Sequence, residues 1–194
     1  MVTAQPTVLL VDDERDVVDV YALAFTDGDY TVLKAYSGEE ALEQVADADV
    51  VLLDRRMPGL SGQDVLDEIR ERGLDVRVAM VTAVDPDFDI TDMAFDSYLT
   101  KPVSDEELRE TVDELLTLAE YDQQVRDQFA VAEKIALLES EKTERELAES
   151  EEYQSLQERA ATLDERTSEA VGSMTQETFE RVLSGLGDDE EERD

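Results

Sequence analysis

Residues 50–59 read VVLLDRRMPG, an apolar run of four residues that ends on the carboxylate of Asp54. A short apolar run bounded by turn residues is typical of a buried β-strand. Two explanations of the acid are open. Asp54 either marks the point where the strand meets water, or it is a carboxylate held at a strand end, where parallel sheets place their functional groups. The sequence on either side distinguishes them.

Apolar runs and helical patterns alternate through residues 1–118. The expected strands are 7–11, 30–36, 49–54, 76–83 and 97–100, and the expected helices are 13–28, 38–46, 62–73, a short one around 86–95, and 104–120. Ser104 and Glu107 have the spacing of a capping box at the start of the last helix. Five strand–helix units predict an α/β fold, a five-stranded parallel sheet with helices on both faces.

Polar side chains follow the predicted strands. Asp12 and Asp13 follow the first strand, Asp54 ends the third, Thr82 ends the fourth and Lys101 follows the fifth. Because the carboxyl ends of parallel strands meet at one edge, we expect these side chains to lie together. Converging carboxylates favour a divalent cation, and hard oxygen ligands select Mg²⁺ or Mn²⁺. With a hydroxyl and an ammonium nearby, the site is predicted to hold a phosphoryl group, with Asp54 as nucleophile.

The chain is strongly acidic, with 52 acidic and 17 basic residues and a net charge of −35. Such a charge destabilises a compact state by self-repulsion unless salt screens it, and the screening length falls to about 3 Å at molar salt. Only 4 of the basic residues are Lys, and Cys is absent. This composition resembles that of proteins from halophiles that keep molar salt in the cytoplasm, such as haloarchaea.

Several classes of protein are excluded by what the sequence lacks. Without Cys there are no disulfides or thiolate metal sites, and without His the chain cannot be a phosphohistidine donor. No apolar segment approaches the roughly 18–20 residues needed to span a bilayer. The N-terminus lacks the basic start of a signal peptide. We therefore expect a cytoplasmic protein without a membrane segment.

From about residue 119 the pattern becomes continuously helical. A first set of apolar positions comprises Leu118, Tyr121, Val125, Phe129, Ala132 and Ala136, and a second comprises Tyr153, Leu156, Ala160, Leu163, Thr167, Ala170 and Met174. The steps of the second set alternate between three and four, which is the a/d seam of a coiled coil. The polar stretch 140–150 separates the sets, so we expect an antiparallel helical hairpin or one long rod. The seam does not say whether the same chain or a second copy fills it. Residues 185–194 are expected to form an acidic, disordered tail.

Four segments carry a resemblance to a known family. LLVDDE (9–14), VLLDRRMPGLSG (51–62), AMVTA (79–83) and YLTKP (98–102) resemble, in order and spacing, the signature of two-component response-regulator receiver domains. The resemblance covers residues 1–118 and implies a flavodoxin-like fold. It implies phosphorylation of Asp54 by a sensor histidine kinase, and no enzymatic activity beyond self-catalysed phosphorylation and dephosphorylation.

The resemblance also implies the roles of individual residues in a Mg²⁺ site. Asp13 and Asp54 would bind the metal directly, together with the backbone carbonyl of Arg56, and Asp12 would bind it through water. Lys101 would pair with the phosphoryl oxygens, from a cis peptide bond to the proline that follows it.

A switch is implied by the same resemblance. Thr82 would move to bond a phosphoryl oxygen, and Tyr98 would rotate inward behind it, which is a local charge change that biases a two-state element. Arg56 and Val84 occupy positions that tune the lifetime of the phosphorylated form. The face affected would include the helix around 86–95, the strand 97–100 and the helix 104–120.

Residues 121–159, YDQQVRDQFAVAEKIALLESEKTERELAESEEYQSLQER, resemble the HalX domain that follows receivers in haloarchaeal regulators. We expect this domain to cover 119–184. HalX regulators are associated with transcription, yet DNA binding normally requires Lys and Arg. Residues 119–194 hold 23 acidic and 8 basic residues, a net charge of −15, and show no helix-turn-helix pattern. Two outputs stay open: regulation of transcription through DNA, or a signalling adaptor that dimerises or docks partner proteins without binding DNA.

Overall fold

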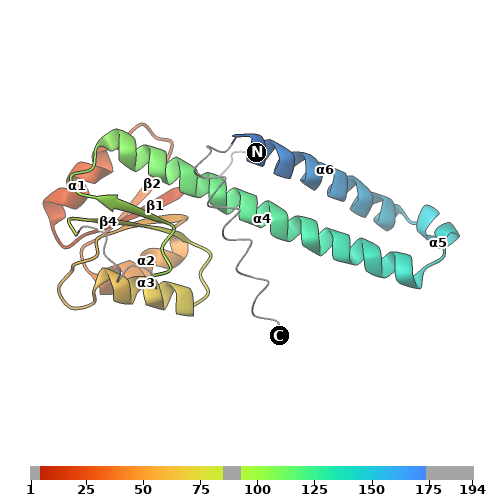
Figure 1. The fold of residues 1–194 in the computed structure, drawn as a ribbon, viewed down its shortest axis with the longest axis horizontal. Helices are drawn as coiled ribbons and strands as arrows, with labels where there is room; N and C mark the ends of the chain where they lie inside the picture. The colour runs from red at the N-terminus through yellow and green to blue at the C-terminus, as the bar shows by residue number, and fades with distance from the viewer. Residues whose placement is uncertain (1–4, 85–92, 174–194) are drawn as a thin grey trace. The chain divides into compact units, whose positions relative to one another are not determined.

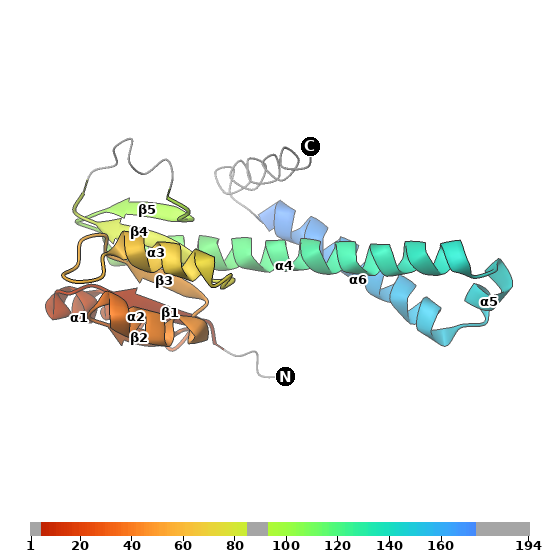
Figure 2. The same cartoon turned by 90° about the horizontal axis from the view of Figure 1, so that it is seen from below.

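The computed structural model describes residues 5–84 and 93–173 of the 194-residue chain. The chain divides into two compact units, residues 1–116 and residues 117–194. Figures 1 and 2 show the elements of both units from two directions. Each unit is described on its own.

The first unit is built on a parallel sheet. Its strands are β1 (Thr7–Val11), β2 (Thr31–Ala35), β3 (Val50–Leu53), β4 (Arg77–Thr82) and β5 (Ser97–Thr100), in the order β2-β1-β3-β4-β5 (Figure 2). Every neighbouring pair runs parallel, and Val11 at the end of β1 lies beside Leu53 at the end of β3. The predicted five-stranded parallel sheet is confirmed, and β1 and β3 end level with one another.

Helices cover both faces of this sheet because side chains alternate between the faces along each strand. On one face, α2 (Gly38–Gln44), the 3₁₀ turn η1 (Val45–Asp47) and α3 (Gly62–Glu71) pack on Leu9, Val51, Leu53 and Met80. On the other face, α1 (Arg15–Leu23) and the start of α4 (Asp105–Glu141) pack on Val8, Leu10, Leu52 and Val81. Both faces of the central strands are therefore core, which explains why β3 reads as a continuous apolar run.

Some predicted boundaries shift. The helix expected over 13–28 ends at Leu23, and the chain then turns towards Gly28, whose φ is +89°. The capping box predicted at the start of α4 is confirmed: the Glu107 carboxylate accepts from the Ser104 N–H at 2.9 Å, and the Ser104 hydroxyl accepts from the Glu107 N–H at 3.3 Å. Most of the helix expected around 86–95 lies outside the described residues, and the described residues 93–95 are not helical.

The second unit is an antiparallel helical hairpin, one of the two arrangements predicted. The part of α4 after Leu116 is followed by the short α5 (Glu144–Ala148) and by α6 (Glu151–Ser173) (Figure 2). The Tyr153 hydroxyl donates to Glu139 at 2.6 Å, whereas the Gln128 amide donates to Asp164 at 3.1 Å. Contacts early in α6 thus fall late in α4, so the two helices run in opposite directions.

The seam on α6 is confirmed over the positions whose side chains are described. Tyr153 and Leu163 are buried, and Leu156, Ala160 and Thr167 are half-buried. The strict alternation of steps of three and four keeps these residues on one side of the helix.

The apolar positions singled out on α4 are covered up to Val125 and exposed beyond it. Phe129 is 72% exposed, and Ala132 and Ala136 are also exposed. The covered positions are Gln128, Val131, Ile135 and Leu138, of which Val131 is only 2% exposed. This part of α4 carries two apolar stripes, and packing against α6 selects the one that the sequence pattern did not favour. None of the described helices has a stretch long and apolar enough to cross a membrane.

The covered positions of α4 predict that removing the smaller side chain, Val131, lowers stability more than removing the larger one, Phe129. Val131→Ala should lower the free energy of unfolding by about 2 kcal/mol, because it empties a buried site. Phe129→Ala removes a larger side chain but one that lies in solvent, so its effect should stay within about 0.5 kcal/mol. Urea unfolding at molar KCl, followed by circular dichroism, compares the two variants. A larger loss for Phe129→Ala than for Val131→Ala would contradict this seam.

Candidate functional site

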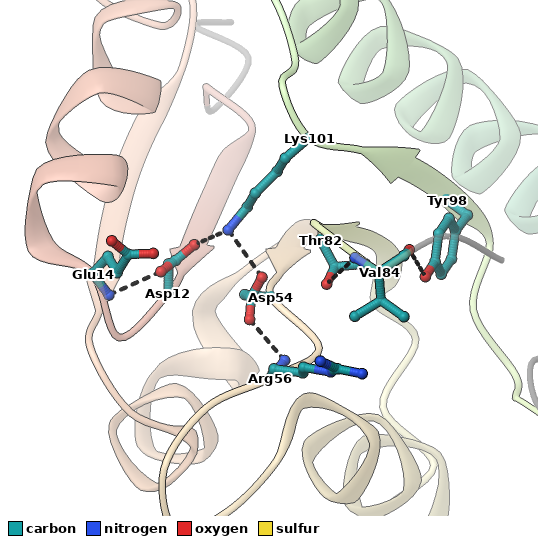
Figure 3. A network of polar contacts seen from close by, with 8 residues as sticks. All are labelled: Asp12, Glu14, Asp54, Arg56, Thr82, Val84, Tyr98 and Lys101. Carbon is teal, nitrogen blue, oxygen red and sulfur yellow. Dashed lines mark hydrogen bonds and ion pairs between the residues drawn. The ribbon is translucent and has the colours of Figure 1, made fainter.

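The sheet backbone brings three polar residues to one edge. The N–H of Asp54 donates to the Val11 carbonyl at 2.9 Å, which continues the β1–β3 hydrogen bonding one residue beyond the strands. The N–H of Lys101 donates to the Thr82 carbonyl at 2.9 Å and does the same for β4 and β5. Asp12, which follows Val11, therefore lies beside Asp54, with Lys101 across the same edge (Figure 3).

The ammonium group of Lys101 joins the two carboxylates. Its Nζ lies 2.5 Å from Oδ2 of Asp12 and 2.9 Å from Oδ1 of Asp54. Asp12 is 4% exposed and Asp54 is 6% exposed. Buried carboxylates this close repel one another unless a cation lies between them. Lys101 is that cation, and it holds the ends of β1, β3 and β5 to one point.

The pKa of Lys101 reflects this balance. Burial alone lowers the pKa of an ammonium, but the hydrogen bonds to Asp12 and Asp54 and the attraction of both carboxylates outweigh it, so the pKa is raised above 10.5. A raised lysine pKa contributes stability that is fully present below pH 10.5 and is lost as the pH rises through the folded-state pKa. The ammonium is therefore charged throughout the physiological range.

Backbone N–H groups orient the other two carboxylate oxygens. Oδ1 of Asp12 accepts from the Glu14 N–H at 2.8 Å, and Oδ2 of Asp54 accepts from the Arg56 N–H at 2.7 Å (Figure 3). Each carboxylate is thus held by the N–H two residues further on and by Lys101. Both groups point to the site in a fixed orientation.

The predicted metal ligands lie at this edge, but not as a closed cluster. Asp13 is exposed beside Asp12, and within residues 5–84 and 93–173 no three acidic side chains are arranged around a common metal position. Mg²⁺ in phosphoryl-transfer sites typically uses only one or two carboxylates, with water and phosphoryl oxygens completing its shell. Two buried carboxylates at an open sheet edge therefore fit Mg²⁺.

Thr82 and Tyr98 are connected to each other through the backbone of Val84. The Thr82 hydroxyl is buried and accepts from the Val84 N–H at 3.4 Å, and the Tyr98 hydroxyl donates to the Val84 carbonyl at 2.7 Å. The ring of Tyr98 also packs on Phe95, with ring centroids 5.5 Å apart. Figure 3 shows Thr82 next to Asp54 and Tyr98 further from the carboxylates. A movement of Thr82 that shifts the Val84 backbone would therefore change the hydrogen bond of the Tyr98 hydroxyl.

Two further features surround the site. The peptide bond between Lys101 and Pro102 is cis, as the resemblance implied. Gly62, at the start of α3, was not singled out from the sequence, yet its N–H donates to the Arg55 carbonyl at 3.0 Å. The only signal for it was a second glycine in the segment VLLDRRMPGLSG. A glycine near a turn has many explanations in a sequence, and only the folded structure shows that Gly62 lies against the Asp54 backbone.

Comparison with protein families gives two matches along the chain. The sequence model described as response regulator receiver domain matches residues 8–113, and that described as HalX domain matches residues 117–183. Together they account for both compact units.

Two similar proteins carry the names of regulators. A "Putative transcriptional regulator" of Haloferax volcanii is 51% identical over 157 residues, which cover 80% of this chain and 27% of that protein. The response regulator SaeR of Staphylococcus aureus is 33% identical over 130 residues, covering 64% of this chain and 57% of SaeR. The chain thus spans about a quarter of the first relative and little more than half of the second.

Solved structures agree with the fold of the first unit. The response regulator TrrA of Thermotoga maritima, in complex with Mg²⁺-BeF, is 33% identical with a TM-score of 0.51, covering 57% of this chain and 99% of that one. The "signal receiver domain of putative Luxo repressor protein" of Vibrio parahaemolyticus is 25% identical with a TM-score of 0.58, covering 63% of this chain and 98% of that one.

Removing the central ammonium should destabilise the first unit. Lys101→Met keeps a stem of similar length but leaves two buried carboxylates without a cation, so the free energy of unfolding should fall by about 3 kcal/mol. The matched control is Lys34→Met, since Lys34 pairs with Asp19 at 2.6 Å on the surface. Its effect should stay below about 1 kcal/mol. Equal losses in urea unfolding at molar KCl would show that Lys101 has no special role.

Proposed function

Because the chain belongs to the response regulators, with a receiver domain followed by a HalX domain, we propose that it accepts a phosphoryl group on Asp54 and changes the contacts of its helical domain in response. The observation that supports this most directly is the buried pair of Asp12 and Asp54, bridged by Lys101 at the sheet edge. The chain contains no His. A phosphohistidine donor therefore lies outside this sequence, and we propose that a sensor histidine kinase supplies it.

In the proposed transfer, a carboxylate oxygen of Asp54 forms a bond to phosphorus while the P–N bond of the donor breaks and the imidazole leaves with the electron pair. Lys101 neutralises charge on the phosphoryl oxygens, and the Arg56 N–H holds the orientation of Asp54. Mg²⁺, held by Asp13, Asp54 and the Arg56 carbonyl directly and by Asp12 through water, would supply further charge neutralisation. The product is an acyl phosphate on Asp54.

The new phosphoryl group would act as the switch. It competes for Lys101, which in this structure is shared by two carboxylates. It also offers acceptor oxygens to the Thr82 hydroxyl, whose present contact with Val84 is long at 3.4 Å. Tyr98 is tied to the same Val84 backbone, so it would move with this segment. The consequence would appear at β5 and the start of α4.

For the output, we favour contacts with proteins over direct contacts with DNA. The helical region from residue 119 carries a net charge of −15, which repels phosphates. The described hairpin fills its own apolar seam, so covering the seam does not require a second copy. Regulation of transcription, suggested by the name of the Haloferax relative, would then be reached through a partner in the cytoplasm. Dimerisation stays a prediction.

Phosphorylation is tested with acetyl phosphate as donor. Wild-type protein with Mg²⁺ at molar KCl should gain the mass of one phosphoryl group, and Asp54→Asn should gain none because the amide is not a nucleophile. Asp67→Asn, an exposed carboxylate on α3, is the matched control and should be modified as wild type is. Removal of Mg²⁺ with a chelator should stop the reaction. Modification of Asp54→Asn would show that the acceptor lies elsewhere.

The output is tested by comparing DNA binding and protein association of the phosphorylated chain. We expect no sequence-selective mobility shift with genomic DNA fragments at molar KCl, because acidic helices and DNA repel one another. We expect light scattering or affinity capture to report protein contacts that depend on phosphorylation. Sequence-selective retardation of DNA would restore direct transcriptional regulation as the function.

A further inference from the structure

The loop from β3 to α3 carries the groups that matter most for transfer. It begins with Asp54 and includes the Arg56 N–H that orients the Asp54 carboxylate at 2.7 Å. At its start, the loop is fixed by the bond from the Asp54 N–H to Val11. Its far end is the first residue of α3, Gly62. The position of Asp54 therefore depends on how closely α3 approaches this backbone.

Gly62 is in direct contact with the backbone that bears the acceptor. A Cβ atom built at this position would overlap the carbonyl oxygen of Asp54, and it would lie 2.9 Å from Cα of Arg55 and 3.0 Å from the carbonyl carbon of Asp54. Real Cβ atoms essentially never approach heavy atoms so closely. The obstacle is backbone, so no change of side-chain rotamer relieves it. Any larger residue must displace the peptide that holds Asp54.

Helix α3 cannot retreat to make room. Its residues Val65, Leu66 and Ile69 are completely buried in the core beneath the sheet. Its first turn is fixed by a capping box between Ser61 and Asp64. The strain of a side chain at position 62 would thus fall on the loop, and so on Asp54 and Arg56.

Backbone freedom does not explain this glycine. Gly62 is the first residue of a helix, and its φ lies outside the left-handed region. In such a helical position Ala is a better helix former than Gly. Gly73, just past the other end of α3, is the opposite case: its φ is +63° and nothing lies within 4 Å of an added Cβ. Gly73 is required for the backbone conformation of the turn, whereas Gly62 is required because another backbone segment lies against it.

We propose that Gly62 is a positioning residue for phosphoryl transfer: its missing side chain lets α3 pack directly on the Asp54–Arg55 peptide and so fixes the acceptor carboxylate. The inference rests on the proposed phosphorylation of Asp54. The inference adds to the residues needed for transfer one that acts only by positioning Asp54.

The test compares Gly62→Ala with Gly73→Ala, two added methyl groups at opposite ends of one helix. With acetyl phosphate and Mg²⁺ at molar KCl, Gly62→Ala should lower the maximal rate of Asp54 modification by about 100-fold, the effect of a misplacement near 1 Å. The acetyl phosphate concentration at half-maximal rate should change little. Gly73→Ala strains the backbone away from the site and should react as wild type does.

A second readout needs no phosphorylation. In the full chain, the Arg56 amide proton should show the NMR shift of a hydrogen bond to a carboxylate in wild type and Gly73→Ala, and lose it in Gly62→Ala. If wild type is not modified while this shift behaves as described, the proposed function fails and the positioning role stands. A folded Gly62→Ala that keeps the Arg56 shift and reacts within about threefold of wild type overturns the inference.

A third variant decides the matter if Gly62→Ala does not fold. Ser61→Ala adds no atoms but removes the cap that fixes the first turn of α3. Loss of a typical cap costs about 1 kcal/mol, which raises the population with an open first turn roughly fivefold. Because the proposal makes this turn hold the loop, hydrogen exchange of the Arg56 amide should speed up by about that factor. An unchanged exchange rate in Ser61→Ala would show that the start of α3 does not position the acceptor.

Discussion

The Lys101 ammonium group between two buried carboxylates is the interaction on which the first unit depends. Three strand ends deliver these groups to one point, and each would be costly there without the others. The same arrangement prepares the site for chemistry. In the proposed function, a phosphoryl group on Asp54 would change which anions Lys101 must balance. The hydrogen bonds from Thr82 through Val84 to Tyr98 lead away from that point. Stability and the proposed signalling would therefore use the same contacts.

Because the chain is strongly acidic and needs salt to screen its charge, the ion pairs that matter most for stability are the buried ones. At molar salt exposed pairs are largely screened, whereas buried pairs are screened much less. The pairs of Lys101 are of the second kind. The cluster at the opposite edge is partly buried. There Asp96 accepts from Arg70, Arg77 and the Val78 N–H, each at 2.8 Å, and fixes the start of β5. In a chain with 17 basic residues against 52 acidic ones, these basic groups hold both ends of the strand that carries Tyr98.

The sequence predicted the sheet and its site because strand patterns are local. Apolar runs mark β1, β3 and β4, and a parallel sheet forces the residues after them, such as Asp12 and Asp54, to one edge. On α4, the apolar positions beyond Val125 were assigned to the wrong side of the helix because both sides carry apolar residues. Only the packing of α6 distinguishes the exposed Phe129 from the buried Val131. Gly62 was missed for a related reason: a glycine required by the closeness of another backbone has no periodicity.

The central claim is that Asp12, Asp54 and Lys101 form one Mg²⁺-dependent cradle for a phosphoryl group. Fluorine NMR of the full chain with beryllofluoride, a phosphoryl analogue, tests it without a kinase or a donor. We predict a bound fluorine signal at molar KCl that appears only with Mg²⁺ and disappears when Asp54 is replaced by Ala. The account would be contradicted by the absence of a bound signal at saturating Mg²⁺, or by one that persists without the Asp54 carboxylate.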